Sequence, residues 1–218
     1  MTVIAIDGPA GSGKGTLAKA ISEKLGYLNI DTGATYRCLA LASIRNNLTI
    51  NDTKELVDLA KKIDIKLTRD GKVFLDNEDV TKLIRSKEVT AIVSQISSAK
   101  EIREVMVDIQ RKCSMNDSVV IEGRDITTVV FPDATYKFYL DASLEERANR
   151  RFQENKQKNI DMTYDEIYEN IKMRDYNDMH KEVGSLMRTD DQIYIDSTNM
   201  TIEEVINMVL NIVRNDDK

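Results

Sequence analysis

The chain has 218 residues, of which 41% are hydrophobic, and a formal net charge of -6 at pH 7. This length and apolar content suit one α/β domain with a small insertion. The acidic surplus argues against nucleic acid or a membrane surface as a partner, because both attract an excess of Lys and Arg. No basic leader precedes the first apolar stretch and no apolar run approaches a membrane span, so we expect a cytoplasmic protein.

The first chemical signal follows the apolar run at 3–6, where the chain reads GPAGSGKGT. This spacing is typical of a phosphate-binding loop, whose backbone amides and lysine surround the phosphates of a nucleoside triphosphate. Gly15 stands where Ser or Thr usually follows the lysine, and the hydroxyl comes at Thr16, so the protein ligands of Mg²⁺ stay open. The predicted ATP-binding residues are Gly8, Pro9, Ala10, Gly11, Ser12, Gly13, Lys14, Gly15 and Thr16.

Short apolar strand candidates alternate with helical patterns along the chain; they lie at 2–6, 27–30, 119–122, 135–140 and 193–195. This alternation predicts a doubly wound α/β fold, in which a parallel sheet carries helices on both faces. Residues 64–80 alternate and turn like a small antiparallel sheet. Residues 152–162 are rich in Gln, Asn and Lys, which predicts an exposed mobile loop acting as a lid.

We therefore expect one domain, 1–218, with three parts. The predicted core covers about 1–62, 86–146 and 175–218, the insertion about 63–85, and the lid about 147–174. Cys38 and Cys113 lie in helical patterns without metal-ligand spacing, which predicts buried thiols in a reducing compartment. Few apolar stretches look exposed, so we expect a monomer.

A second anion site is predicted at the carboxyl ends of the strands, where ligands bind in such sheets. Arg37 opens the helix after the second strand, and Arg124 and Asp125 follow the third. Arginines at this edge suit an acceptor phosphate. Two helical stretches add polar stripes, which are Arg147, Arg150 and Arg151 beside the lid, and Arg174, Asp178 and Lys181 on a later helix. Each stripe is also compatible with a solvated face held by intrahelical ion pairs.

In this order, GPAGSGKGT, DTGATYR, EGRDITTVVFPDA, EERANRR and RDYND resemble bacterial-type cytidylate kinases over essentially the whole chain. The loop form is shared with adenylate kinases, whereas GRDI followed by VVFPDA is narrower. The resemblance implies a P-loop NTPase fold with a five-stranded parallel sheet, a three-stranded NMP-binding insertion and a helical lid. Helices up to about residue 112 would adjoin the acceptor site. The implied reaction is transfer of the γ-phosphoryl group of ATP to CMP or dCMP, with Mg²⁺.

The resemblance also implies an acceptor site made of Thr32, Arg37, Ser94, Arg103, Arg124, Asp125, Arg174 and Asp178. Asp125, Arg103 and Ser94 would match the cytosine edge, whereas the uracil carbonyl would meet Asp125 with repulsion. Arg37 and Arg124 would hold the acceptor phosphate, and Arg174 and Asp178 would reach the sugar. Many relatives have serine where this chain has Thr32, and arginine where it has Lys181. Charge on the transferring group would be stabilised by Lys14, Arg124, Arg147 and Arg151.

Other functions share parts of this pattern. A kinase for UMP, AMP, dTMP or a small alcohol would keep the loop but lacks a use for the cytosine-matching residues. A nucleotide-dependent switch would also bind the triphosphate, although an arginine-rich lid is surplus to it. Asp31-Thr32-Gly33 resembles an aspartic protease segment, but the remote second candidate, Asp196-Ser197-Thr198, lacks the glycine. Asp7 and His180 receive no role.

Overall fold

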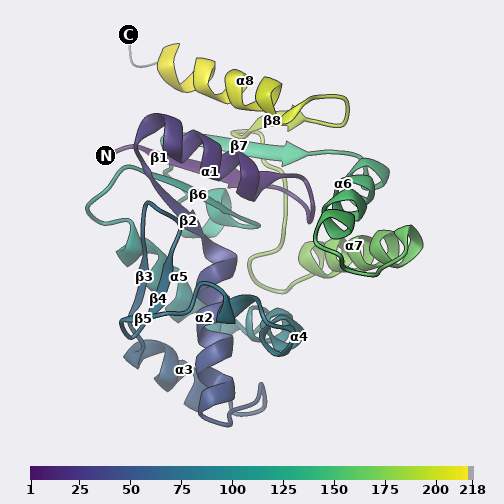
Figure 1. Ribbon diagram of the computed structural model, residues 1–218. Coiled ribbons are helices and arrows are strands. Elements are labelled where there is room, and N and C mark those ends of the chain that lie inside the picture. The colour runs from purple at the N-terminus through teal and green to yellow at the C-terminus, as the bar shows by residue number, and fades with distance from the viewer. Residues whose placement is uncertain (216–218) are drawn as a thin grey trace.

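The main sheet of this computed structural model has five parallel strands in the order β2-β6-β1-β7-β8 (Figure 1). The structure describes residues 1–215, so the end of the expected core, 216–218, lies outside the described residues. The strands are β1 (Val3–Asp7), β2 (Leu28–Asp31), β6 (Val119–Gly123), β7 (Tyr136–Asp141) and β8 (Ile193–Asp196). The predicted strands and the doubly wound class are confirmed.

Alternating side chains of β1 bury both faces of this sheet, as the period of a strand requires. Ile4 and Ile6 pack with α1 (Lys14–Leu25) and α8 (Ile202–Asn215) on one face. Val3 and Ala5 pack on the other face, together with residues of α5 (Lys100–Cys113) and of the π-helical segment η2 (Ile126–Val130). Helices therefore cover both faces. Because the five strands are parallel, their carboxyl ends meet at one rim of the sheet.

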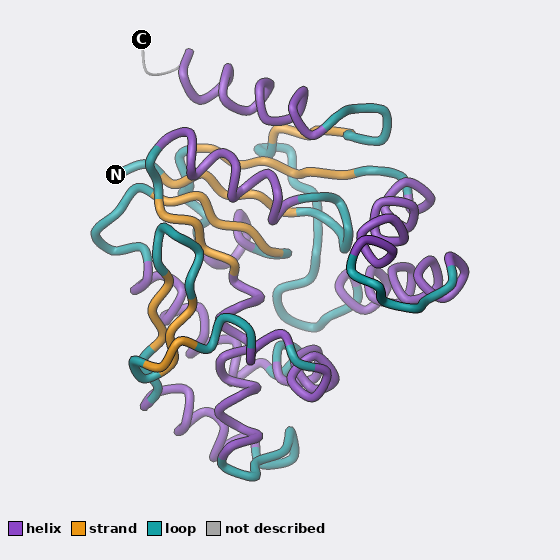
Figure 2. The backbone as a smooth tube through the Cα atoms, in the orientation of Figure 1, coloured by secondary structure: helices purple, strands orange, loops and turns teal. Residues whose placement is uncertain are grey.

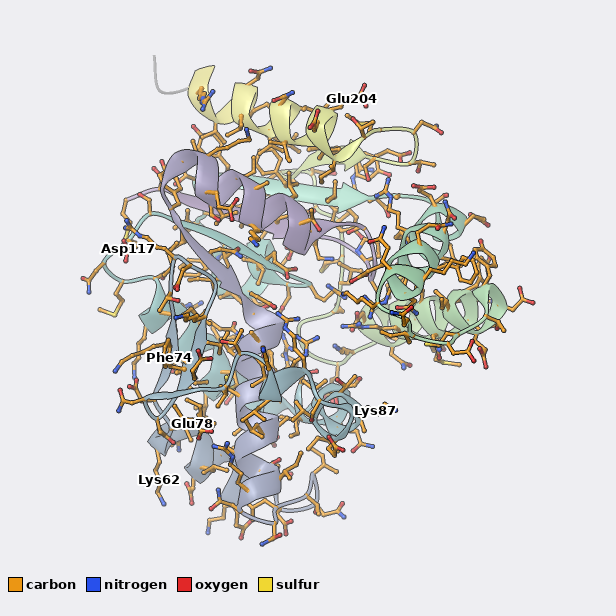
Figure 3. The ribbon with its side chains drawn as sticks, in the orientation of Figure 1. Lys62, Phe74, Glu78, Lys87, Asp117 and Glu204 are labelled. Atoms are coloured by element: carbon orange, nitrogen blue, oxygen red, sulfur yellow. The ribbon has the colours of Figure 1, made fainter. Side chains whose placement is uncertain are left out.

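The small antiparallel sheet is also confirmed, with the order β3-β4-β5. Its strands are β3 (Ile65–Leu67), β4 (Val73–Leu75) and β5 (Glu78–Asp79), and Figure 3 labels Phe74 and Glu78 on it. Their inward side chains share an apolar cluster with α2 (Thr32–Arg45), α3 (Thr53–Lys62), η1 (Leu83–Arg85), α4 (Lys87–Ile96) and α5. This cluster contains no residue of the main sheet, so the insertion belongs to a layer with its own core.

Two helices, α6 (Leu144–Gln157) and α7 (Tyr164–Met179), project beyond the rim of the main sheet (Figures 1 and 2). The expectation of a loop over 152–162 is wrong for its first half, because α6 continues to Gln157. Ser143 caps its start by accepting a hydrogen bond from the Glu146 amide at 3.2 Å. Ion pairs of Arg150 with Glu146 and of Lys158 with Glu154 join successive turns, and long straight side chains favour a helix.

The polar stripe expected through Lys181 is also shorter than predicted, because α7 ends at Met179 and His180 is its C-cap. The Lys181 Nζ still donates to Asp178 Oδ1 at 2.7 Å, so the turn beyond the helix keeps the two charges together. Cys38 and Cys113 are both free thiols, the first buried and the second partly buried. Within residues 1–215, none of the helices is both long and apolar enough to cross a bilayer.

Candidate active site

The phosphate-binding loop lies between the end of β1 and the start of α1, where the free amides of the first helical turn create a positive field. Lys14 is the first residue of α1 and its side chain folds back over the loop. Its Nζ donates to Pro9 O at 2.8 Å and to Ser12 Oγ at 3.4 Å. The ammonium group is therefore held at the mouth of the loop, beside the backbone that would surround the phosphates.

Several cations converge on Lys14. Burial and the positive charge of Arg124 lower the pKa of Lys14 to about 7, although Glu122 opposes the change. Partial burial and the charges of Arg124 and Arg37 likewise lower the pKa of Arg174. Among residues 1–215, the side chains of Arg37 and Arg174 have no hydrogen-bond or ion-pair partner. Neighbouring positive charge thus opposes protonation of Lys14 and Arg174, and such a cluster of cations suits an anionic ligand.

Asp178 connects α7 to the segment that follows β6. Its Oδ2 accepts a hydrogen bond from Arg124 Nε at 2.7 Å, while Oδ1 accepts from Lys181. Nearby, Thr32 Oγ1 donates to Glu122 O at 2.8 Å, which joins the start of α2 to the same rim. The structure thus brings Thr32, Arg124, Asp178 and Lys181 to the carboxyl ends of β2 and β6, as the sequence predicts for an acceptor site.

Arg103 of α5 and Asp125, just beyond β6, form a buried ion pair, with 5% and 6% of each residue exposed. Burial raises the pKa of Asp125, and the adjacent guanidinium opposes that rise. Arg103 Nη1 also donates to Ser97 O at 2.9 Å, but its buried Nε has no partner among residues 1–215. Ser94 lies exposed on α4 and, within that range, makes no hydrogen bond to the pair. Two of the three expected base-reading side chains are therefore in contact.

Arg147 lies in a different setting from the one its helical phase suggests. Its guanidinium is buried, pairs with Asp175 of α7, and donates to Ala10 O at 2.9 Å and to Ala142 O at 2.9 Å. These bonds use Nε and Nη1, so Arg147 braces the phosphate-binding loop. Its contact with the transferring phosphoryl group stays a prediction. Arg151 is exposed and pairs with Glu154 at 2.9 Å.

The third arginine of the α6 stripe, Arg150, reaches the phosphate-binding loop and the turn after β8. It donates from Nη1 to Ser12 O at 3.4 Å and from Nη2 to Ser197 O at 2.6 Å. The three arginines of the α6 stripe therefore lie in three different environments. Helical spacing predicts the side of the helix on which a side chain lies, but not the residues that it contacts there.

Two buried carboxylates of the site are absent from the predicted set. Asp175 Oδ1 accepts from the Ala10 amide at 2.9 Å, and Asp7 accepts from the amides of Ile126 and Thr127 at 2.8 and 2.9 Å. A signal for Asp7 exists in the sequence, because a charged residue ends an otherwise apolar buried strand. Asp175 has no such signal, since it stands in a run of polar residues on a half-exposed helix.

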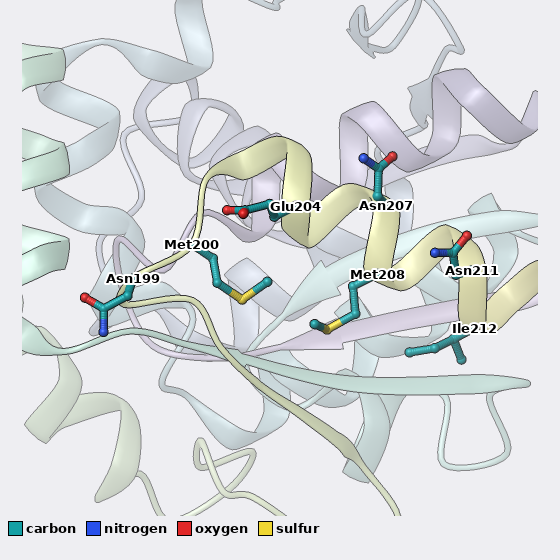
Figure 4. Close-up of a pocket in the computed structure, with 7 residues that line it drawn as sticks. All are labelled: Asn199, Met200, Glu204, Asn207, Met208, Asn211 and Ile212. Carbon is teal, nitrogen blue, oxygen red and sulfur yellow. The ribbon is translucent and has the colours of Figure 1, made fainter.

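A groove of about 600 Å³ lies at α8 and the turn before it (Figure 4). Its lining contains none of the predicted site residues; it consists of Asn199, Met200, Glu204, Asn207, Met208, Asn211 and Ile212. The catalytic assignment therefore rests on the rim of the main sheet.

Comparison with known proteins identifies the family of the chain. The family model described as cytidylate kinase matches residues 4–215. A cytidylate kinase of Caldanaerobacter subterraneus subsp. tengcongensis is 46% identical over 216 residues, which cover 99% of this chain and 96% of that protein. A cytidylate kinase of Fusobacterium nucleatum is 44% identical over 207 residues, with 95% and 94% coverage.

Among solved structures, an uncharacterised protein from Eubacterium ventriosum has a TM-score of 0.55 and 14% identity, and the match covers 98% of this chain and 99% of that one. At this level of identity the likeness concerns the fold alone. The sequence relatives are far closer, and they match the chain across both the phosphate-binding loop and the acceptor rim. This chain therefore belongs to the cytidylate kinase family.

Proposed function

We propose that Lys14 and the cations around it stabilise the direct transfer of the γ-phosphoryl group of ATP to the phosphate of CMP or dCMP. The family makes the chain a kinase that phosphorylates CMP with ATP, so kinases of other acceptors and a pure switch are not favoured. The observation that carries the residue assignment is the position of Lys14, whose Nζ lies over the phosphate-binding loop and whose pKa is lowered to about 7 by burial and by the charge of Arg124. Two bound phosphate chains would neutralise this charge.

Three groups share the work on the phosphates. Lys14 and the loop amides bind the donor, while Arg37 and Arg124 hold the acceptor phosphate, with Arg124 fixed by Asp178. The acceptor phosphate is mostly dianionic at neutral pH, since its second pKa is about 6, and it attacks in line without a protein base. Arg174 adds charge to the same space, and Arg151 follows when α6 and α7 close over the donor. Arg147 positions the loop through Ala10.

Arg103 and Asp125 are assigned to the cytosine base. The carboxylate accepts from the exocyclic amino group, and the unpartnered Arg103 Nε is a donor for a ring acceptor of the base. Uracil offers a carbonyl in place of the amino group, which the carboxylate repels. Ser94 is exposed on α4, and we propose that it reaches the base when this helix moves inward.

Mg²⁺ fits the rim as an ion held mainly by the nucleotide. Among residues 1–215 no three His, Cys, Asp or Glu side chains form a metal cage, which is normal for nucleotide-bound Mg²⁺. The exposed Thr16 hydroxyl and the Glu122 carboxylate, which approaches Gly15, are oxygen ligands suited to it. When bound, the ion neutralises charge on the donor phosphates. Its position would be tested by comparing the Mg²⁺ requirement of Thr16→Val with that of the unaltered protein.

The direct experiment measures ADP formed from MgATP with CMP, dCMP, UMP, AMP, dTMP or no acceptor. We expect fast turnover confined mainly to CMP and dCMP. Preference for another acceptor would keep the kinase and remove the base assignment of Asp125. ATP hydrolysis that ignores the acceptor would overturn the proposal as a whole.

A further inference from the structure

Asp7 is a buried carboxylate that the reaction described above does not use. It ends β1, has 0% exposure, and immediately precedes Gly8 of the phosphate-binding loop. Burial raises the pKa of Asp7, hydrogen bonds from Thr127 and Ile126 oppose this rise, and the charge of Asp125 adds to it. A buried carboxylate costs stability unless hydrogen bonds compensate it, so the partners of Asp7 explain why it is there.

Those partners follow Asp125 directly. Asp7 Oδ1 accepts from the Ile126 amide at 2.8 Å, and Oδ2 accepts from the Thr127 amide at 2.9 Å and from Thr127 Oγ1 at 2.7 Å. In the strand register Asp7 lies beside Gly123, so the side chain spans from β1 to the turn that β6 enters. One carboxylate thus holds both amides that follow the base-reading residue.

A third segment closes the same arrangement. Gln192, at the start of β8, has its Nε2 against Thr127 Oγ1, and 3.5 Å from Asp7 Oδ2. Its Oε1 accepts from the Thr189 amide at 2.8 Å. The turn after β6 is therefore held by two segments, which are the end of β1 through Asp7 and the residues before β8 through Gln192.

We propose that Asp7 is a positioning residue for acceptor recognition, which sets Arg124 and Asp125 relative to the phosphate-binding loop by anchoring the amides of Ile126 and Thr127. This inference rests on the proposed role of Asp125 in reading the base. Because Asp7 is fully buried and bound to the turn, its replacement is expected to act on CMP through the turn. Charge-assisted hydrogen bonds to a carboxylate are stronger than neutral ones, so an amide in its place holds the turn less firmly.

The decisive variant is Asp7→Asn, because its carboxamide has one acceptor oxygen where the carboxylate has two. In either orientation its Nδ2 would face a hydrogen-bond donor, which is the Ile126 amide at one oxygen position and Thr127 at the other. We expect KM for CMP to rise roughly tenfold and the preference for CMP over UMP to fall, with KM for ATP changed less than about threefold. Thr127→Val loses the hydroxyl bonds to Asp7 and Gln192 and keeps both amide bonds, so KM for CMP should rise by a smaller factor, about two- to threefold.

Two controls separate this role from a general loss of stability. Val213→Ala leaves a cavity in the core beneath α8, far from the turn, and should lower the melting temperature with both KM values unchanged. Equal rises in KM for CMP and ATP in Asp7→Asn would overturn the inference, as would an unchanged CMP preference. If Asp7→Asn does not fold, an unchanged KM for CMP in Thr127→Val overturns it instead.

Asp125→Asn separates the base-reading role of Asp125 from the positioning role of Asp7. An unchanged CMP preference in Asp125→Asn would remove the base assignment and the inference with it. A lowered preference in Asp125→Asn together with an unchanged one in Asp7→Asn would remove the inference alone.

Discussion

Arg147 of α6 and Asp175 of α7 form a buried ion pair that holds both backbone groups of Ala10 in the phosphate-binding loop. The Arg147 guanidinium donates to the Ala10 carbonyl, and the Asp175 carboxylate accepts from the Ala10 amide. The helices that would close over the donor are thereby tied to the loop that binds it.

Removal of Asp175 should be costly, because it leaves a buried guanidinium without its counter-charge. We expect Asp175→Ala to lower the free energy of unfolding by roughly 3 kcal/mol and to raise KM for ATP more than KM for CMP. Chemical denaturation and steady-state kinetics measure the two effects. Glu154→Ala, which breaks the exposed pairs with Arg151 and Lys158, should lower the free energy of unfolding by less than about 1 kcal/mol and serves as the control. Equal losses in the two variants would contradict the bracing role.

Lys14 should take up a proton when ATP binds. Its pKa is about 7 in the free protein, against 10.5 for the ordinary side chain, so at about pH 8.5 it is mostly neutral. Bound triphosphate favours the charged form and raises this pKa, so binding takes up a proton, whereas below about pH 6 the group is already charged. Calorimetry in buffers of different protonation enthalpy measures the uptake. We expect none in Lys14→Met, and the same uptake in both proteins would refute the assignment.

Asp125→Asn should weaken the discrimination between cytosine and uracil. The asparagine amide can donate to the uracil carbonyl, whereas the aspartate carboxylate repels it. We expect the ratio of kcat/KM for CMP to that for UMP to fall about tenfold or more. Asp178→Asn is the matched control, since Asp178 holds Arg124 on the phosphate side and its loss should lower both values with little change in their ratio. A change of that ratio only in Asp178→Asn would reverse the two roles.

Gly8 occupies a conformation that other residues avoid, with φ of 151°, and a Cβ there would overlap the carbonyl of Leu140 on β7. Gly8→Ala should therefore destabilise the fold strongly and abolish ATP binding, as thermal melting with and without ATP would show. Gly26→Ala controls for backbone strain, because Gly26 has φ of 71° but nothing within 4 Å of its Cβ position. The free energy of unfolding of Gly26→Ala should fall by only about 1 kcal/mol. Similar melting temperatures for the two variants would mean that the close approach to Leu140 is unimportant.

The sequence predicted the parts of the molecule that depend on local pattern. The apolar strands, the glycine loop before Lys14, and the position of Arg37 after β2 all follow from short stretches of chain. Partners that are distant in sequence were not predictable in the same way. Asp7 and Thr127 are 120 residues apart, and Arg147 and Asp175 are 28 apart, so no periodicity links them. The end of α6 was missed because Gln, Asn and Lys are read as loop residues, although ion pairs along the helix stabilise it there.

The separate apolar cluster around α2, α3 and the small sheet affects how the molecule can unfold locally. Its buried residues include none from β1, β6, β7 or β8, which pack instead with α1, α8 and part of α5. Contacts inside one cluster can be lost together while those of the other persist, which is the condition for two cooperative units in one chain. The layer that we propose for the acceptor nucleotide can thus unfold locally while the sheet below the phosphate-binding loop stays folded.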